Sequence, residues 1–177
     1  MKFVDDYESV LKKFNSKNIR YVVIGVFGIN YYANDPGNRV LTQDCDILLK
    51  PLVKNLLDAL KILMAEGFNL ESNGEPLGDV DAWLVKKLIE RRSVVTARKG
   101  DVLRIDLVIE GGGIPYSTWE KNRRLFKAGN TRIYVGDLPQ LLRAKENANR
   151  EKDRKFLALY KIQLKEMLDA HKQKTKK

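Results

Sequence analysis

The sequence predicts an α+β domain in which helices flank a mixed β-sheet and a helical segment forms the C-terminal end. Short apolar runs bounded by turn residues alternate with longer amphipathic stretches, as expected for the strands and helices of one domain. Some of these runs are separated by tight turns and others by a helix, so both hairpins and crossover connections are expected. A length of 177 residues is sufficient for one domain with a well-packed core.

The first 50 residues predict a helix, a strand, a second helix and a second strand. Residues 4–16 carry apolar side chains at helical spacing behind an acidic first turn, and residues 20–25 form a short apolar run closed by glycine. Another helix begins within residues 26–33 and ends at the turn residues of 34–38. The aliphatic run of residues 45–49 is typical of a buried strand.

The middle of the chain contains the clearest helical pattern. Residues 51–68 are amphipathic, with Pro51 near the start and Gly67 at the end, where these residues favour helix boundaries. Residues 80–92 also have helical spacing. Residues 93–109 predict two strands joined by a Lys-Gly or Lys-Gly-Asp turn, so a hairpin is expected there.

The last third of the chain changes from strands to helices. Residues 110–122 predict a loop followed by a short helix, and residues 125–135 predict a hairpin with a Gly-Asn tip. Apolar spacing is helical over residues 138–170. We therefore expect an α/β core over 1–136, a helical segment packed on it over 137–171, and a basic tail over 172–177.

The formal net charge of +10 predicts a polyanionic partner, because Lys and Arg attract phosphate backbones. The alternative is a basic protein whose charges only contact solvent. Basic residues are most frequent from Arg143 onward. No apolar run is long enough for a membrane span, and the first residues lack the features of a signal peptide, so we expect no membrane partner and a cytoplasmic location.

Scarce cysteine and histidine exclude several kinds of catalytic site. Cys45 is the single cysteine, so neither an internal disulfide nor a cysteine zinc site is possible. His171 is the single histidine and lies near the C-terminal end, which argues against Ser-His-Asp and Cys-His nucleophile systems and multi-histidine metal sites. Catalysis would depend on carboxylates, lysines, the backbone and bound metal.

Asp44 and Asp46 stand at the beginning of the predicted strand at 45–49, and strand alternation places their side chains on one face. The Asp-x-Asp spacing is common by chance, and Asp79 and Asp81 repeat it without a suggestive context. Adjacent carboxylates repel each other unless a proton or a cation intervenes. A hard divalent cation, Mg²⁺ or Mn²⁺, is therefore the expected ligand of the first pair.

Asp106 lies within an aliphatic run that predicts a buried strand, where a charged residue requires a partner. One explanation is a structural ion pair with Arg104 or Lys99. The other is that Asp106 joins Asp44 and Asp46 in a three-carboxylate metal cluster. We favour the cluster.

Gly25 stands between a predicted strand and a predicted helix. A glycine at that position allows a phosphate to approach the backbone. The segment matches neither a P-loop nor a dinucleotide-binding fingerprint. The Gly-Gly-Gly run at 111–113 also fails these tests, and we expect it to be a flexible connection.

The order of these features is a strand, Gly25, a helix, a strand that carries Thr42, Asp44 and Asp46, a long helix, and Asp106 on a later strand. This order resembles the polymerase-beta-like nucleotidyltransferase superfamily. It is most similar to the small branch that contains abortive-infection-type toxins and minimal nucleotidyltransferases. The resemblance covers roughly residues 20–160.

Two further motifs of the toxin-like branch have counterparts in this chain. An Arg and a Thr commonly precede the Asp-x-Asp, and Arg39 and Thr42 occupy comparable positions with one extra residue between them. A later helical Lys is followed by an Arg-x-Lys-Asp stretch, which here corresponds to Lys145, Arg150, Lys152 and Asp153.

The resemblance implies a nucleotidyltransferase-like fold and a metal-dependent transfer of a nucleoside monophosphate from a nucleoside triphosphate. The basic surface would suit RNA, in particular tRNA, or protein as the acceptor. The similarity to the toxin branch implies the role of a toxin with an acidic antitoxin partner. The implied catalytic residues and ligands of Mg²⁺ or Mn²⁺ are Asp44, Asp46 and Asp106. The implied nucleotide-binding residues are Gly25, Arg39, Thr42 and Lys145.

Two other functions are compatible with the same sequence. The first is a nucleotidyltransferase fold kept as a nucleic-acid or protein binding module without chemistry. Val26 supports it, because a β-branched residue follows Gly25 where the superfamily usually has a second small one. The second is an enzyme that modifies cationic small molecules such as aminoglycosides, against which the strong positive charge argues.

Overall fold

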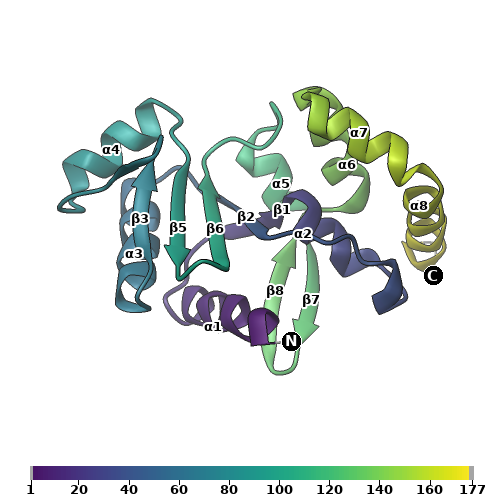
Figure 1. Ribbon diagram of the computed structural model, residues 1–177, viewed down its shortest axis with the longest axis horizontal. Coiled ribbons are helices and arrows are strands. Elements are labelled where there is room, and N and C mark those ends of the chain that lie inside the picture. Colours follow the sequence, from purple (N-terminus) through teal and green to yellow (C-terminus); the bar gives the residue numbers. More distant parts are fainter. Residues whose placement is uncertain (1, 176–177) are drawn as a thin grey trace.

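The computed structural model describes the backbone of residues 2–175 and the side chains of residues 7–173 (Figure 1). Within these residues, eight strands form a single sheet. The strands are β1 Tyr21–Ile24, β2 Asp44–Leu49, β3 Asn69–Ser72, β4 Glu75–Pro76, β5 Val95–Lys99, β6 Leu103–Val108, β7 Arg124–Ala128 and β8 Thr131–Val135. Their order across the sheet is β4-β3-β5-β6-β2-β1-β8-β7.

The sheet is mixed, as predicted. β2 pairs in parallel with β6, and β1 pairs in parallel with β8, whereas the other neighbours are antiparallel. The two predicted hairpins are confirmed as β5–β6 and β7–β8. The helices are α1 Lys2–Ser16, α2 Gly25–Ile29, α3 Val53–Ala65, α4 Ala82–Glu90, α5 Tyr116–Asn122, α6 Leu138–Ala148, α7 Glu151–Leu159 and α8 Lys161–Thr175. The predicted α+β class is therefore confirmed.

Three differences from the predicted elements have physical reasons. The strand expected at 45–49 begins at Asp44, because the backbone of Asp44 already pairs with β6. The hairpin of β3 and β4 turns at Asn73 and Gly74, both with positive φ, and this short polar hairpin has little apolar periodicity to predict it. The helical stretch expected over 138–170 is interrupted where Asn149 adopts the left-handed conformation that ends α6.

The tail expected over 172–177 is partly helical. α8 continues to Thr175, and the last two residues lie outside the described part of the chain. Among the described residues, no helix has both the length and the apolar character needed to cross a membrane.

The two faces of the sheet differ around β3, β5 and β6. Leu70, Ala97 and Ile105 are buried on one face, where α3 packs on β3 and α4 packs on α3 (Figure 1). The residues that alternate with them along the strands are polar and include Arg98 and Arg104. An antiparallel sheet commonly has such a solvated second face. This polar face continues onto β2, where it meets the predicted site.

Trp119 on α5 is the largest fully buried side chain, with 0% exposure. Its indole nitrogen donates a hydrogen bond to the carbonyl of Gly111 at 3.1 Å. A Cβ at Gly111 would lie 2.7 Å from that nitrogen, and one at Gly112 would lie 2.7 Å from Ala144. The expectation that residues 111–113 form only a flexible connection is therefore wrong, because at least two of the glycines allow close packing.

The two tryptophans provide a matched test of this core. Trp119→Ala should lower the free energy of unfolding by about 3–5 kcal/mol, because it removes a large buried side chain and its hydrogen bond. Trp83→Ala should change it by less than about 0.5 kcal/mol, because Trp83 is 68% exposed on α4. Urea unfolding followed by circular dichroism measures both values. Equal losses would contradict the assignment of Trp119 to the core.

Candidate active site

The three carboxylates predicted from the sequence lie on neighbouring strands. β2 and β6 pair in parallel so that Asp44 is opposite Arg104 and Asp46 is opposite Asp106. Opposite residues in a sheet project to the same face, and residues two apart along a strand share a face. Asp44, Asp46 and Asp106 therefore converge on the polar face of the sheet, as the cluster hypothesis requires.

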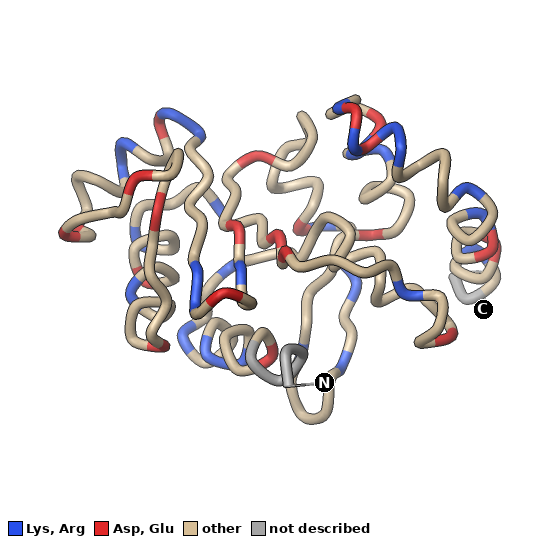
Figure 2. Tube along the Cα trace, in the orientation of Figure 1, with Lys and Arg blue, Asp and Glu red and all other residues tan. Residues whose placement is uncertain are grey.

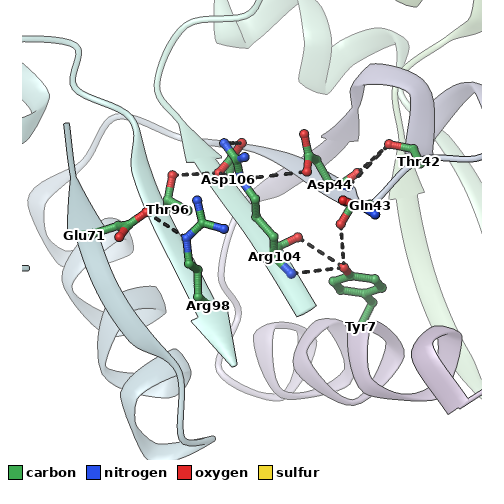
Figure 3. Close-up of polar contacts among 9 residues, drawn as sticks. All are labelled: Tyr7, Thr42, Gln43, Asp44, Glu71, Thr96, Arg98, Arg104 and Asp106. Carbon is green, nitrogen blue, oxygen red and sulfur yellow. Dashed lines mark hydrogen bonds and ion pairs between the residues drawn. The ribbon is translucent and has the colours of Figure 1, made fainter. Parts of the chain in front are cut away.

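Arg104 forms the ion pair that was the alternative explanation for Asp106 (Figure 3). Its Nε and Nη2 donate to the two carboxylate oxygens of Asp106 at 3.0 and 2.9 Å. The same Nε lies 3.8 Å from Asp44 Oδ1. Asp106 also accepts a hydrogen bond from the hydroxyl of buried Thr96 at 2.8 Å. The guanidinium thus lies between two of the three carboxylates.

Tyr7 on α1 fixes the backbone beneath this ion pair. Its hydroxyl lies 3.1 Å from the carbonyl of Gln43 and 3.2 Å from that of Arg104, and it accepts a hydrogen bond from the Arg104 amide at 3.3 Å. Burial raises the pKa of the Tyr7 hydroxyl above its usual value. Sequence reasoning assigned Tyr7 only to a helix face and did not identify Thr96. The position of Thr96 opposite Asp106 could have been found from the register of the β5–β6 hairpin.

Gly25 makes room for Asp46. It has a φ of +68° at the start of α2, and a Cβ on it would overlap Asp46 Oδ2. Any other residue here would both strain the backbone and displace the carboxylate. The structure therefore assigns Gly25 a steric role beside Asp46, in addition to the phosphate contact expected from the sequence.

The ionisation of Asp46 is strongly perturbed. Burial, and then the charges of Asp106 and Asp44, raise its pKa to about 6, and the charges of Lys145 and Lys152 partly oppose this increase. No hydrogen bond or ion pair from another described residue reaches the Asp46 side chain. Asp46 is therefore the carboxylate in this cluster that most lacks a compensating partner.

Lys145 on α6 lies near enough to Asp46 for its charge to lower the pKa of that carboxyl, but its amine is paired with Asp153. Its Nζ lies 3.2 Å from Asp153 Oδ1, and Arg150 Nε lies 2.6 Å from Asp153 Oδ2. Burial tends to raise the pKa of Asp153, but the hydrogen bond from Arg150 and the charge of Lys145 lower it below its usual value. This ion triad joins α6 to α7 and positions the charge of Lys145 near Asp46.

The remaining predicted residues lie at the entrance to β2. The hydroxyl of Thr42 is 3.4 Å from the amide and 3.3 Å from the carbonyl of Asp44, so Thr42 is directly beside the cluster. Arg39 is exposed in the preceding loop. Within the described part of the chain, no ion pair joins Arg39 to a carboxylate.

The carboxylate oxygens of Asp44, Asp46 and Asp106 are the type of ligand atom that a divalent cation binds. Carboxylate oxygens are the ligands that Mg²⁺ and Mn²⁺ prefer. Among the described residues, however, no three or more His, Cys, Asp or Glu side chains are arranged to hold a metal ion. Arg104 supplies the positive charge between Asp44 and Asp106 instead.

The sequence matches no protein-family model and no curated protein. Among solved structures, the chain is similar to a crystal structure of an antigenic nucleotidyltransferase-like protein from Paracoccidioides brasiliensis. The TM-score is 0.45 at 14% identity, and the similarity covers 78% of this chain and 62% of the other. The chain thus spans less than two thirds of that protein, and a similarity at this level carries no conclusion about activity.

Gly25→Ala should lower the free energy of unfolding by more than Gly100→Ala does. Both glycines have positive φ, +68° and +61°, so both substitutions add backbone strain of about 1–2 kcal/mol. Only Gly25→Ala also forces Asp46 to move, since a Cβ at Gly100 meets nothing within 4 Å. Chemical unfolding of both variants measures the difference. Equal losses would contradict the packing of Asp46 against Gly25.

Asp46→Asn should stabilise the fold in a pH-dependent way. The pKa of Asp46 is raised in the folded state from 3.8 to about 6, so the folded protein binds the additional proton between these values. The stability of the wild type relative to the variant should therefore fall as the pH rises from about 4 to about 6, by up to about 3 kcal/mol, and then level off. Unfolding measured at pH 4, 5, 6 and 7 tests this.

Asp79→Asn is the matched control, because Asp79 is exposed and lies outside the cluster. The stability difference between the wild type and Asp46→Asn should vary more steeply with pH than that between the wild type and Asp79→Asn. Equal profiles for the two variants would contradict the perturbation of Asp46 by the fold.

Proposed function

We propose that the protein is a metal-dependent nucleotidyltransferase that moves a nucleoside monophosphate from a nucleoside triphosphate to RNA. The observation that carries this proposal is the convergence of Asp44, Asp46 and Asp106 on one face of the sheet, beside the turn at Gly25. Arg104 compensates Asp106 and lies near Asp44, whereas Asp46 has no ion pair with another described residue. A cation bound during function would compensate the charge of Asp46 as well.

Asp44, Asp46 and Asp106 would hold the divalent cations. Bound Mg²⁺ or Mn²⁺ supplies charge neutralisation for the phosphates and for the attacking and leaving oxygens. The chain itself would mainly position the substrates, because nucleotidyl transfer depends on geometry and charge. Thr96 would orient Asp106 through the hydrogen bond that it donates.

The nucleotide phosphates would lie between the Gly25 turn and α6. Thr42 would donate its hydroxyl to a phosphate oxygen, and Lys145 would contribute its charge from the triad with Asp153. Arg39 would reach the phosphates from its exposed loop, where no carboxylate in the described part of the chain holds it. Charge-assisted hydrogen bonds of this kind suit phosphate oxygens.

RNA is the proposed acceptor because of the net charge of +10. Figure 2 shows lysines and arginines repeated along α7 and α8, the helices that follow Lys145. Transfer to tRNA in particular, a toxin role with an acidic antitoxin partner and a cytoplasmic location are parts of the proposal that rest on the family resemblance and on composition.

A binding module without chemistry is the second candidate. The ion pair of Arg104 with Asp106 favours it, because the guanidinium lies where a cation would contact that carboxylate. Val26, the residue after Gly25 in α2, adds a β-branched side chain next to the proposed phosphate position. In this case the carboxylates would serve the fold or a partner and would not support transfer.

Label transfer separates the two candidates. Purified protein is incubated with each α-³²P nucleoside triphosphate, with Mg²⁺ or Mn²⁺, and with total RNA or protein. We expect label in RNA, and Asp46→Asn should reduce the transfer at least ~10²-fold, because the substitution removes a charge from the reacting centre. Asp79→Asn should retain the rate of the wild type.

Wild-type protein that binds RNA but transfers no label with either metal would support the binding module. A Val26→Gly variant then completes the test, because it removes the side chain next to Gly25. If that variant also binds no nucleotide, the transferase proposal is wrong. Label found only in protein would support nucleotidyl transfer and show that the acceptor is protein and not RNA.

A further inference from the structure

Arg104 is surrounded by charge on three strands of the sheet. It lies opposite Asp44 on β2 and opposite Arg98 on β5, and it forms a bidentate ion pair with Asp106 two residues along its own strand. Arg98 is bound to Glu71 at 2.8 Å, so Arg104 is the arginine committed to the carboxylate cluster. Figure 3 shows both ion pairs on the same face of the sheet.

The guanidinium of Arg104 supplies the positive charge that the buried carboxylate of Asp106 requires. Asp106 is only 7% exposed, and a carboxylate at that depth requires compensation. Arg104 and Thr96 together occupy Asp106 Oδ1, and Arg104 alone occupies Oδ2. Oδ2 can accept one further bond, but a metal ion bound there would lie next to the guanidinium, and the two positive charges would repel each other.

We propose that Arg104 is a resident counter-cation that a divalent metal must displace from Asp106 and Asp44, so that Arg104 sets the metal affinity of the site. The proposal rests on the metal site of the proposed function. Binding of the metal and pairing of Arg104 with Asp106 oppose each other, so each weakens the other by the same factor. The cluster is therefore compensated in both states, by the guanidinium or by the metal.

A cavity beside the cluster provides space for the displaced side chain. It has a volume of about 220 Å³ and is lined by Gln43, Asp44, Arg98, Arg104 and the turn of residues 100–103. Asp101 on that turn is exposed and offers the guanidinium another carboxylate. The backbone of Arg104 stays in place during this exchange, because the Tyr7 hydroxyl is hydrogen-bonded to both its amide and its carbonyl. Only side-chain rotation is required.

Binding of Mn²⁺ tests the proposal without an activity assay. The dissociation constant is measured by electron paramagnetic resonance of free Mn²⁺ for the wild type, Arg104→Gln, Arg104→Lys and Arg98→Gln. We expect Arg104→Gln to bind Mn²⁺ roughly tenfold to hundredfold more tightly, since the competing charge-assisted bonds are lost. Arg104→Lys should lie between this variant and the wild type, because lysine keeps the charge but lacks the two-pronged geometry.

Arg98→Gln is the matched control, because it removes the same charge from the same face while Asp106 keeps its partner. Its Mn²⁺ affinity should remain within about twofold of the wild type, since its exposed charge acts through solvent. Equal tightening in Arg98→Gln and Arg104→Gln would overturn the proposal in favour of a general charge effect. Thermal unfolding verifies that each variant is folded.

Two further outcomes would overturn the proposal in distinguishable ways. Equal and measurable affinity in the wild type and Arg104→Gln would reject the competition and leave the metal site intact. No Mn²⁺ binding by either protein would reject both the competition and the metal site. If Arg104→Gln does not fold, Arg104→Lys replaces it in the test. An Mn²⁺ affinity of Arg104→Lys equal to that of the wild type would contradict displacement of the bidentate ion pair.

Discussion

Parallel pairing of β2 with β6 is the constraint on which the candidate site depends. The pairing holds Asp46 opposite Asp106 and Asp44 opposite Arg104, so three negative charges and one positive charge share a small area of one face. A shift of one residue in either strand would turn its charged side chains toward the core. The buried residues Cys45 and Ile105, which alternate with these side chains, therefore fix the register that assembles the site.

Charge compensation in this area comes from two directions. Arg104 neutralises Asp106 from within the sheet, where Tyr7 on α1 holds its backbone, and the charge of Lys145 acts on Asp46 from α6. Asp46 receives no ion pair from another described residue, and its burial, reinforced by the charges of Asp106 and Asp44, raises its pKa to about 6. The unequal distribution makes Asp46 the position at which added positive charge would have the largest effect.

The fold class and the β5–β6 and β7–β8 hairpins could be predicted from periodicity and turn residues, and the shared face of Asp44 and Asp46 from strand alternation. For Asp106 the sequence offered an ion pair with Arg104 or Lys99 and a metal cluster, and we favoured the cluster, whereas the structure shows the ion pair with Arg104. That choice depends on side-chain geometry, which periodicity does not specify. Thr96 was not found because its role depends on register, which periodicity does not specify. Gly111 was misassigned because its role depends on Trp119, a side chain contributed by another element. Side-chain geometry and strand register, which periodicity does not specify, decide each of the contacts that were missed.

The packing of Trp119 has a consequence for how the sequence can vary. A Cβ at Gly136 would lie 2.5 Å from the indole ring, and one at Gly111 would lie 2.7 Å from its nitrogen. A larger residue at either glycine is compatible with the fold only if position 119 becomes smaller at the same time. Since protein interiors are close-packed, enlarging a glycine alone would overfill the core, and shortening the side chain at position 119 alone would leave a cavity. The three positions, which belong to three different segments of the chain, should therefore covary as one unit in any lineage that retains this fold.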